Sequence, residues 1–432
     1  MKMKHNVLLI GSGGREHAMT WRIAQSPSCG ELFVAPGNAG TSSLATNVNL
    51  DISDLQAVKA FCLERAIDLV VVGPEQPLVD GIVDFIRSEE ELQQIAVVGP
   101  DSTAAQLEGS KEFAKEFMSK YDIPTAAYRS FQANELEEAL AYIDQIQAPY
   151  VIKADGLAAG KGVVIAEDAD TAKNTLIAFL KDKQFGEASS KVVIEAFLKG
   201  IEMSCFVAVD GTENYIVLPR AKDYKRIGEG DTGLNTGGMG AISPVPFEDK
   251  ALFKKIEEAV VKPTVQGILS EGYHYRGFVF IGLMIVDQNP FVIEYNVRMG
   301  DPETQVVFPR FETDYIDFFK AIALGNLNAV EHKELQEAAT TVIAVSKGYP
   351  QSYEKGKAIT GLAPIDNDRI VFHAGTKTDN GQLLSNGGRV LAFTSYGSTI
   401  QNALDKSYEQ LSKASFEGMT FRKDIGFDLE TE

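Results

Sequence analysis

The sequence predicts a multidomain protein of the α/β and α+β classes. It places an open parallel α/β sheet at the N-terminus and a small, mostly β domain at the C-terminus. Three observations support this prediction. The chain has 432 residues, too many for one ordinary hydrophobic core, and its length suggests about three domains. Its first hundred residues repeat the order strand, glycine-containing turn and helix, which is typical of a parallel sheet. After about residue 330 the pattern changes to short strands and turns.

Composition excludes several classes of protein. The hydrophobic fraction of 44% and the charged fraction of 23% are normal for a soluble globular protein. A formal charge of −19 disfavours non-specific nucleic-acid binding. The cysteines Cys29, Cys62 and Cys205 are too far apart for a zinc motif or a disulfide scaffold. Because no segment reads as a signal peptide or approaches the roughly 18 apolar residues of a membrane span, we expect a cytoplasmic protein without membrane contact.

The N-terminal strands each end in a glycine-containing turn. In a parallel sheet these turns meet at the carboxyl edge, where ligands bind. The first turn, residues 11–14, precedes a helix whose backbone N–H groups can hold a phosphate. Glu16 stands where a Gly-x-Gly-x-x-Gly pattern has its third glycine, so a plain tight turn is the alternative. The predicted strands cover residues 6–10, 32–35, 68–72 and 95–98.

The middle of the chain mixes helix and strand patterns. A helical run that contains Lys111 ends before Pro124, since proline breaks a helix. Helices are predicted over residues 104–121, 131–146 and 252–269. Strands are predicted over residues 150–154, 163–166, 192–196, 205–209, 215–218 and 277–286, and in the C-terminal part over 339–346 and 389–394.

A glycine-rich loop with two lysines connects the strands at 150–154 and 163–166. Lys153 ends the first strand and Lys161 lies in the loop, an arrangement that suits a lid over nucleotide phosphates. The loop is not a Walker motif, because Gly162 follows Lys161 and a strand follows Gly162. The alternative is a plain hairpin loop with solvated lysines.

Two further segments suggest ligand contact. Backbone groups of residues 195–198 can pair with an adenine edge, and Glu202 can accept hydrogen bonds from ribose hydroxyls, although both glutamates also suit an ordinary surface. Residues 220–240 combine basic groups with many glycines. Because glycine costs conformational entropy, a dense cluster indicates close backbone approach to another group, with a surface loop as the alternative.

Residues 291–298 read as the floor of a metal and phosphate site. Side chains alternate along a strand, so Glu294, Asn296 and Arg298 project from one face. The carboxylate and the amide oxygen can bind a hard cation, and the guanidinium suits an anion held by that cation. The alternative is a half-exposed edge strand. The apolar residues predicted on the opposite face are Ile293, Tyr295 and Val297.

Taken in order, these motifs resemble the ATP-grasp superfamily and, more closely, the glycinamide ribonucleotide synthetase (phosphoribosylamine–glycine ligase) family. The chain departs from the family pattern at Tyr224, Ala196 and Leu234, where histidine, an acidic residue and proline are frequent. The segments that carry the resemblance are Gly-Ser-Gly-Gly-Arg-Glu-His from Gly11, Pro-Gly-Asn-Ala-Gly-Thr from Pro36, Gly-Pro-Glu-Gln-Pro-Leu from Gly73, Lys-Ala-Asp-Gly-Leu-Ala-Ala-Gly-Lys-Gly-Val from Lys153, Asn-Thr-Gly-Gly-Met-Gly from Asn235 and Glu-Tyr-Asn-Val-Arg-Met-Gly-Asp-Pro-Glu-Thr-Gln from Glu294.

The resemblance implies a reaction and a division into domains. The reaction joins glycine to 5-phosphoribosylamine through a glycyl phosphate, with ATP and Mg²⁺ or Mn²⁺, in purine biosynthesis by a monomer. The implied domains are an N-terminal phosphoribosylamine-binding domain (1–104), a central ATP-grasp domain (105–126 and 195–330), a lid subdomain (127–194) and a C-terminal domain (331–432).

The resemblance also implies roles for individual residues. Arg298 and Lys153 would be catalytic, and Glu294 and Asn296 would bind the metal. The implied ATP-binding residues are Lys111, Lys153, Gly160, Lys161, Gly162, Glu195, Ala196, Leu198 and Glu202. The implied substrate-binding residues are Gly13, Gly14, Arg15, Asn38, Glu75, Asp223, Arg226, Asn235, Gly237, Gly238 and Asp301.

Three other functions remain possible from the sequence. Another ATP-grasp ligase would share the metal strand and the lid, but not the segments at Asn235 and Met299. A nicotinamide-dependent dehydrogenase would have an acidic residue at the end of the second strand, where Pro36 stands. A non-catalytic nucleotide sensor would not need the metal strand.

Overall fold

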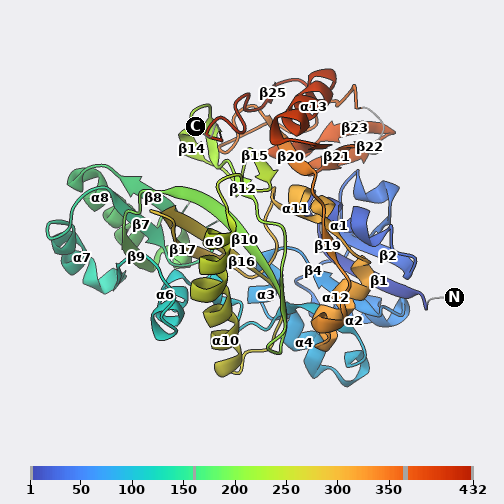
Figure 1. Ribbon diagram of the computed structural model, residues 1–432, viewed down its shortest axis with the longest axis horizontal. Coiled ribbons are helices and arrows are strands. Elements are labelled where there is room, and N and C mark those ends of the chain that lie inside the picture. Colours follow the sequence, from blue (N-terminus) through green and yellow to red (C-terminus); the bar gives the residue numbers. More distant parts are fainter. Residues whose placement is uncertain (1–2, 159–161, 363–367, 430–432) are drawn as a thin grey trace.

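The computed structural model describes residues 3–158, 162–362 and 368–429. Figure 1 shows the N-terminal elements on one side, the elements of residues 128–196 on the opposite side, and the C-terminal elements above the centre. No helix within the described ranges combines the length and apolar character that crossing a membrane requires.

The N-terminal part is the predicted open parallel sheet. Its strands follow the order β3-β2-β1-β4-β5, and each neighbouring pair is parallel. Their carboxyl ends, with the glycine turns, therefore lie at one edge. The strands are β1 (His5–Gly11), β2 (Cys29–Pro36), β3 (Thr46–Asn47), β4 (Leu69–Val72) and β5 (Ala96–Pro100), and the helices are α1 (Gly14–Ile23), α2 (Leu55–Glu64), α3 (Glu75–Val79) and α4 (Ile82–Ser88).

The central sheet continues this parallel sheet. Strand β5 pairs antiparallel with the first residues of β16 (Tyr275–Val286), and β16 pairs along its length with β10 (Ile201–Asp210) and β17 (Asn289–Asn296). Strand β11 (Tyr215–Val217) extends the sheet beyond β10. The remaining central elements are α5 (Gln106–Gly109), α6 (Lys111–Lys120), α9 (Lys250–Ile256), α10 (Lys262–Ser270), α11 (Thr304–Arg310), α12 (Tyr315–Leu324), β18 (Phe311–Glu312) and β19 (Lys333–Glu334).

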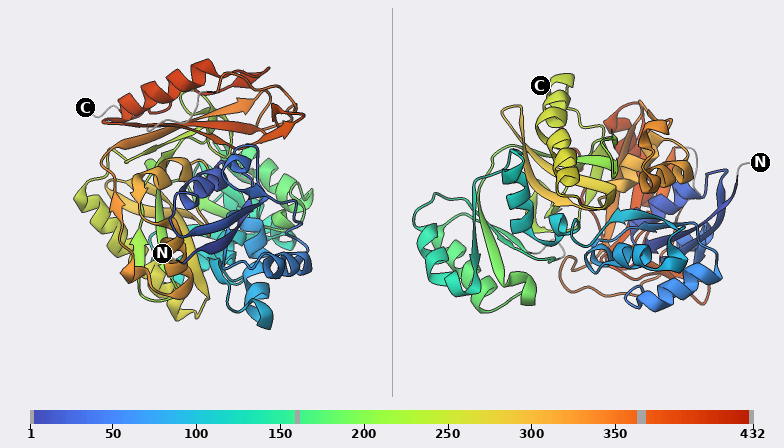
Figure 2. Two further views of the ribbon diagram at one scale, coloured as in Figure 1. Left: turned by 90° about the vertical axis from the view of Figure 1, so that its right-hand side faces the viewer. Right: turned by 90° about the horizontal axis from the view of Figure 1, so that it is seen from below.

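A separate antiparallel sheet of order β6-β9-β7-β8 belongs to the unit that projects on the left of Figure 1 and of the right-hand view of Figure 2. The sequence predicted one helix over residues 131–146, which is wrong at its start. Residues 128–132 pair with β9, and the aromatic ring of Phe131 fills the core of this unit, a role that suits a strand. The elements are β6 (Tyr128–Gln132), α7 (Leu136–Ile143), β7 (Tyr150–Ala154), β8 (Val163–Ala166), α8 (Ala169–Leu176) and β9 (Lys191–Ala196).

The C-terminal sheet recruits two strands from the middle of the chain. Its order is β12-β15-β20-β24-β21, with β25 also paired to β20. The long helix at residues 400–413 was not predicted, and it lies across one face of this sheet (Figure 2). The elements are β12 (Lys222–Asp223), β15 (Gly240–Ser243), β20 (Ala338–Ser346), β21 (Arg369–His373), β22 (Thr376–Asp379), β23 (Gln382–Ser385), β24 (Arg389–Gly397), α13 (Ile400–Lys413) and β25 (Met419–Thr420).

The sequence predicts a long glycine-rich loop over residues 223–239. Residues 222–238 are here called the glycine-rich segment. Part of the segment forms a hairpin of β13 (Arg226–Gly228) and β14 (Thr232–Asn235). The segment therefore has regular backbone pairing, which the density of glycines concealed in the sequence.

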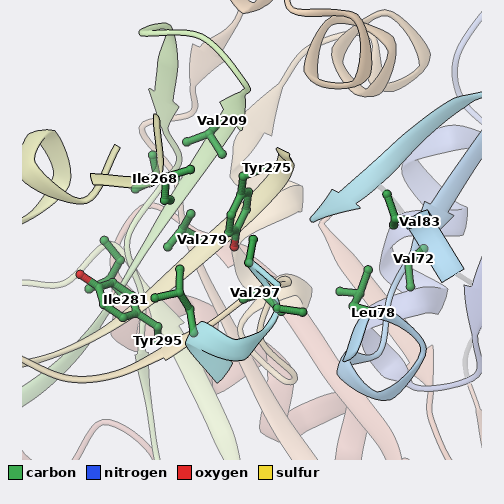
Figure 3. Close-up of a cluster of buried hydrophobic side chains, with 14 of the residues drawn as sticks. Val72, Leu78, Val83, Val209, Ile268, Tyr275, Val279, Ile281, Tyr295 and Val297 are labelled. Atoms are coloured by element: carbon green, nitrogen blue, oxygen red, sulfur yellow. The ribbon is translucent and has the colours of Figure 1, made fainter. Parts of the chain in front are cut away.

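One hydrophobic core supports both the parallel sheet and the central sheet (Figure 3). Val72 from β4 and Leu78 from α3 belong to the same buried cluster as Ile281 from β16 and Tyr295 from β17. Burial of such a side chain stabilises the fold by roughly 1.5–3 kcal/mol relative to exposure. The floor formed by β17 is therefore anchored to the N-terminal domain as well as to its own sheet.

Candidate active site

A cleft of about 580 Å³ lies where all of these units meet. Its walls come from β17, α5, α6, the strand β9, the N-terminal glycine turns, the glycine-rich segment and the C-terminal domain. Many of the predicted site residues line it, namely Arg15, Glu75, Lys111, Gly162, Glu195, Asp223, Asn235, Gly237, Glu294, Asn296, Arg298 and Asp301.

The floor of the cleft is β17, and a bulge shapes it. Asn296 lies opposite Phe280 and Glu294 lies opposite Gly282, but Val292 already lies opposite Leu283, so residue 293 is extra. Ile293 was predicted on the core face with Tyr295. The bulge instead brings Ile293 to the side of Glu294, since a Cβ atom at Gly282 would lie 3.3 Å from Cγ1 of Ile293 and 2.9 Å from Cγ of Glu294. The carbonyl of Ile293 accepts a hydrogen bond from Lys153 Nζ at 2.9 Å.

Gly282 makes room for Glu294. A Cβ atom at Gly282 would lie 2.9 Å from Cγ of Glu294. The described residues offer the Glu294 carboxylate neither a hydrogen bond nor an ion pair, although it lines the cleft. A carboxylate in this position is available to an incoming cation.

Arg298 is held by oxygen atoms on three sides. Its Nη2 donates to Oε1 of Glu108 at 2.5 Å and to Oδ1 of Asn296 at 3.1 Å, and its Nε donates to Oε2 of Glu75 at 3.3 Å. Burial opposes the charged form, but Glu108 and Glu75 outweigh it, so the pKa of Arg298 is raised. The guanidinium therefore stays positively charged and oriented in the cleft.

Glu108 was not predicted as a site residue. It is buried at the end of α5, and its Oε2 accepts a hydrogen bond from the backbone N–H of Val297 at 2.8 Å. Burial raises the pKa of Glu108 despite the positive charge of Arg298. No sequence pattern links residues 108 and 298, since only the fold brings α5 against the end of β17.

Two lysines bind the buried carboxylate of Glu195. Its Oε1 lies 2.8 Å from Nζ of Lys153 and its Oε2 lies 3.0 Å from Nζ of Lys115. Burial raises the pKa of Glu195, but the two lysines outweigh it and the net pKa is lowered. The side chain of Glu195 is thus engaged within the protein, and its backbone lies between the paired strands β6 and β7.

Lys111 and Lys115 lie one helical turn apart on α6. The sequence predicted Lys111 inside one helix of residues 104–121, whereas Ser110 breaks that run, and its side chain caps α6 by accepting the N–H of Phe113. Lys111 is therefore the first residue of α6, and its Nζ donates to the carbonyl of Gly156 at 3.0 Å. Burial lowers the pKa of Lys115 to about 8. The i,i+4 spacing was the signal for Lys115 that sequence reasoning missed.

Lys225 joins two carboxylates beside the cleft. Its Nζ lies 3.0 Å from Oδ1 of Asp223 and 3.2 Å from Oε2 of Glu202. The side chain of Glu202 is therefore paired within the protein. Glu303, another cleft residue that was not predicted, lies near Asp223 and is 3% exposed.

A smaller cavity of about 310 Å³ lies beside the cleft, between the N-terminal glycine turns and the C-terminal domain. Gly13 and Asn38 line it, and Asp301, Tyr349 and Arg389 line both cavities. These three residues form a wall common to the two cavities. Tyr349 and Arg389 were not predicted, because their sequence neighbourhood has no motif.

The glycine turn after β1 already uses some of its own backbone donors. The N–H of Gly13 donates to Oε2 of Glu16 at 2.6 Å, and this hydrogen bond caps α1. Glu16 is the residue that stands in place of the third glycine of a Gly-x-Gly-x-x-Gly pattern. The carboxyl of Asp301 accepts hydrogen bonds from Gln305 Nε2 at 2.7 Å and from the backbone of Arg15. Two acidic side chains therefore lie at this helix start.

Several predicted site residues lie away from the described cleft lining. Gly14 packs against Gln305, and Gly238, with φ +111°, packs against Pro302. Gly160 and Lys161 lie outside the described residues. The predicted residues that the described lining of the larger cleft does not include are Gly13, Gly14, Asn38, Lys153, Ala196, Leu198, Glu202, Arg226 and Gly238.

The donor set on β17 fits a hard divalent cation. Glu294 has a carboxylate without a described hydrogen bond or ion pair, and Asn296 adds, on the same face, an amide oxygen that also accepts a hydrogen bond from Arg298. Within the described ranges no group of three or more His, Cys, Asp or Glu residues is arranged to hold a metal ion by itself. Two protein oxygens suit Mg²⁺, which takes its other ligands from water and phosphate groups.

The position of Glu303 predicts a pH-dependent stability difference for Glu303→Gln. Burial and then the negative charge of Asp223 raise the pKa of Glu303 from 4.5 to about 7. As the pH rises, the unfolded chain loses the Glu303 proton near pH 4.5, whereas the folded chain keeps it until about pH 7. The wild type therefore loses stability as the pH rises between these two values. We expect the free energy of unfolding of Glu303→Gln, relative to that of the wild type, to rise by about 1–3 kcal/mol between pH 5 and pH 8. Denaturant unfolding at both pH values measures this gain, and an unchanged difference would contradict it.

Three family models match successive parts of the chain. Residues 5–108 match the N domain of the phosphoribosylglycinamide synthetase family, residues 109–304 match its ATP-grasp (A) domain, and residues 339–428 match its C domain. These matches cover most of the sequence.

Curated relatives match over nearly their full length. A phosphoribosylamine–glycine ligase of Vibrio parahaemolyticus is 47% identical over 425 residues, which are 98% of this chain and 97% of that protein. A protein of the same name from Chlorobaculum tepidum is 46% identical over 427 residues, with coverage of 97% and 99%.

Solved structures show the same fold. The crystal structure of phosphoribosylamine–glycine ligase from Thermotoga maritima has a TM-score of 0.81 and 38% identity, and the match covers 97% of this chain and 99% of that one. The biotin carboxylase domain of Hydrogenobacter thermophilus 2-oxoglutarate carboxylase, solved with MgADP and bicarbonate, has a TM-score of 0.73 at 17% identity over 97% and 92% of the two chains. The second likeness concerns the fold alone.

Proposed function

The chain belongs to the phosphoribosylglycinamide synthetase family, and we propose that it joins glycine to 5-phosphoribosylamine at the expense of ATP. The products are glycinamide ribonucleotide, ADP and phosphate, in purine biosynthesis. The observation that carries this proposal is the match, over nearly the full length, to relatives named phosphoribosylamine–glycine ligase, at 46–47% identity. The cleft supports it, because lysines, an arginine and a pair of metal-type ligands meet there.

The proposed reaction has two steps. A carboxylate oxygen of glycine attacks the γ-phosphorus of ATP, the bond to the bridging oxygen of ADP breaks, and glycyl phosphate forms. The amine of 5-phosphoribosylamine then attacks the glycyl carbonyl, phosphate leaves with one oxygen of glycine, and the nitrogen loses a proton. Phosphoryl transfer of this kind needs positioning and charge neutralisation more than covalent help from the protein.

The larger cleft has the charges that the first step needs. Lys111 and Lys153 would neutralise phosphate oxygens. The backbone after Glu195 would contact the adenine, and Gly162 would lie near the nucleotide. Glu294 and Asn296 would hold Mg²⁺ or Mn²⁺, which would supply charge neutralisation between phosphate groups. Arg298 would stabilise negative charge on the transferring phosphoryl group.

The smaller cavity is the proposed place for the phosphoribosyl group, with Gly13 and Asn38 in its lining. Glycine would lie in the larger cleft beside Asp223, whose negative charge suits an ammonium group. Since Asp301, Tyr349 and Arg389 line both cavities, the amine and the acyl phosphate would meet at this common wall.

The division into four domains, the monomeric state and the cytoplasmic location remain predictions. The central region predicted for residues 195–330 contributes β12 and β15 to the C-terminal sheet. The domains are therefore linked through shared strands as well as through the cleft.

Other ATP-grasp ligases are the alternative, because biotin carboxylase domains have the same fold. An assay of ADP release separates these functions. We expect ADP release that requires both glycine and 5-phosphoribosylamine, the latter formed from ribose 5-phosphate and ammonia in the mixture. Turnover with bicarbonate or D-alanine, and none with glycine, would contradict the proposal.

A further inference from the structure

Residues near the end of the described chain contact the glycine-rich segment. Residues 422–428, here called the C-terminal clamp, make polar contacts with residues 222, 224, 226, 230 and 231 of that segment, and Arg422 and Ile425 also contact Tyr408 of α13. These two stretches are about two hundred residues apart in the sequence, so the contact is a product of the fold.

Arg422 is the centre of the C-terminal clamp, and its side chain is 0% exposed. Its Nη1 donates to Oδ1 of Asp231 at 2.6 Å and to the carbonyl of Arg226 at 3.2 Å. Its Nε and Nη2 each donate to the carboxylate of Asp424 at 2.8 Å. Burial opposes its charge, but Asp424 and Asp231 outweigh it and raise the pKa of Arg422. Because the guanidinium is planar and donates in several fixed directions, it fixes the orientation of Asp231 and Asp424 relative to each other as well as their distance.

The two acidic residues of the C-terminal clamp add contacts on either side. Asp424 Oδ2 accepts the backbone N–H of Gly230 at 2.7 Å. Asp428 accepts the hydroxyl of Tyr224 at 2.9 Å, and its other oxygen lies 3.1 Å from Nζ of Lys222. Tyr224 is 1% exposed, so its hydroxyl would otherwise be a buried donor without a partner.

The same segment supplies one wall of the cleft. Its residues Asp223 and Lys225 alternate along the chain with Lys222 and Tyr224, which face the C-terminal clamp. Thr236 donates to the carbonyl of Lys225 at 2.8 Å and links the first part of the segment to its last part. A shift of the backbone on the clamp side would therefore move the cleft side.

We propose that the C-terminal clamp positions the glycine-rich segment for glycine binding. Arg422, Asp424 and Asp428 are then positioning residues of the ligase, although none of them belongs to the described lining of the cleft. Nucleotide binding, which involves α6, β9 and β17, does not depend on the clamp. This inference rests on the proposed function, because it takes glycine as the ligand beside Asp223.

Steady-state kinetics of Asp428→Ala and Tyr224→Phe test the inference. The side chain of Asp428 is 27% exposed, so its removal leaves no cavity in the hydrophobic core. We expect Asp428→Ala to raise the KM for glycine about 5- to 20-fold and to change the KM for ATP less than about twofold, since small displacements of binding groups have large effects. Tyr224→Phe keeps the ring and should shift the KM for glycine in the same direction.

A double variant and a control sharpen the test. Tyr224→Phe combined with Asp428→Ala should raise the KM for glycine by less than the product of the two single effects, because both changes break the same hydrogen bond. Glu409→Ala removes ion pairs with Arg369 and Lys413, neither of which involves a residue of the clamp, and should leave both KM values unchanged.

Several outcomes would overturn the inference. One is an unchanged KM for glycine in folded Asp428→Ala. Another is an equal rise of both KM values, which would indicate general loosening. If Asp428→Ala does not fold, an unchanged KM for glycine in Tyr224→Phe has the same meaning. A wild-type enzyme without glycine-dependent ADP release would contradict the proposed function itself, and is thereby distinguished from a failure of the clamp.

Discussion

Replacing Glu294 with alanine is expected to lower kcat at least about a hundredfold, the scale on which loss of a charge-stabilising element acts. Glu294 provides a carboxylate on the cleft floor without a described hydrogen bond or ion pair, next to the amide oxygen of Asn296. Its loss leaves one protein ligand for the cation. ADP release measured over a range of Mg²⁺ concentrations should show a lower kcat and a higher Mg²⁺ requirement.

Two comparisons make the Glu294 result specific. Glu294→Gln retains the shape of the side chain but not its charge, and should resemble Glu294→Ala. Glu258→Ala removes an exposed carboxylate elsewhere in the same domain and should leave turnover and the Mg²⁺ requirement unchanged. Full turnover of Glu294→Ala would show that the cation, if bound, is held by other residues.

Replacing Arg298 with alanine is expected to lower kcat about 10²- to 10³-fold. The guanidinium contacts Glu108, Glu75 and Asn296 at the same time. A lysine retains the charge but cannot make these contacts with one ammonium group, so Arg298→Lys should also lose most activity. ATP-dependent ADP release at saturating substrates measures the loss.

Stability must be separated from catalysis for Arg298. Removing it leaves Glu108 as a buried carboxylate without its cation, which costs about 3–5 kcal/mol. The double variant Arg298→Ala with Glu108→Gln removes that charge and should recover stability without recovering kcat. Recovery of kcat in the double variant would show that Arg298 acts through folding alone.

The sequence was most informative where a periodic pattern met a local constraint. Strands of the N-terminal sheet were predicted because each apolar run ends in a glycine turn, and the observed β1 and β4 follow those runs. The polar face of β17 was predicted from strand alternation, and Glu294, Asn296 and Arg298 do line one cleft. The family resemblance is confirmed by the comparisons.

The remaining features depend on contacts between distant parts of the chain. The bulge that brings Ile293 to the side of Glu294 arises from pairing with β16, which the pattern of residues 291–298 does not contain. Glu108, Lys115 and Glu303 become site residues only when α5, α6 and the turn after β17 converge. The last two residues of β6 were predicted as helix because pairing with β9 overrides the local pattern.

The most direct test of the account follows an oxygen atom of glycine. If the enzyme reacts glycine, labelled with ¹⁸O in its carboxylate, with ATP and 5-phosphoribosylamine, one labelled oxygen should appear in the released phosphate. That transfer is required by attack of the carboxylate on the γ-phosphorus followed by loss of phosphate. Formation of glycinamide ribonucleotide with unlabelled phosphate would contradict the glycyl phosphate route and the role proposed for the cleft.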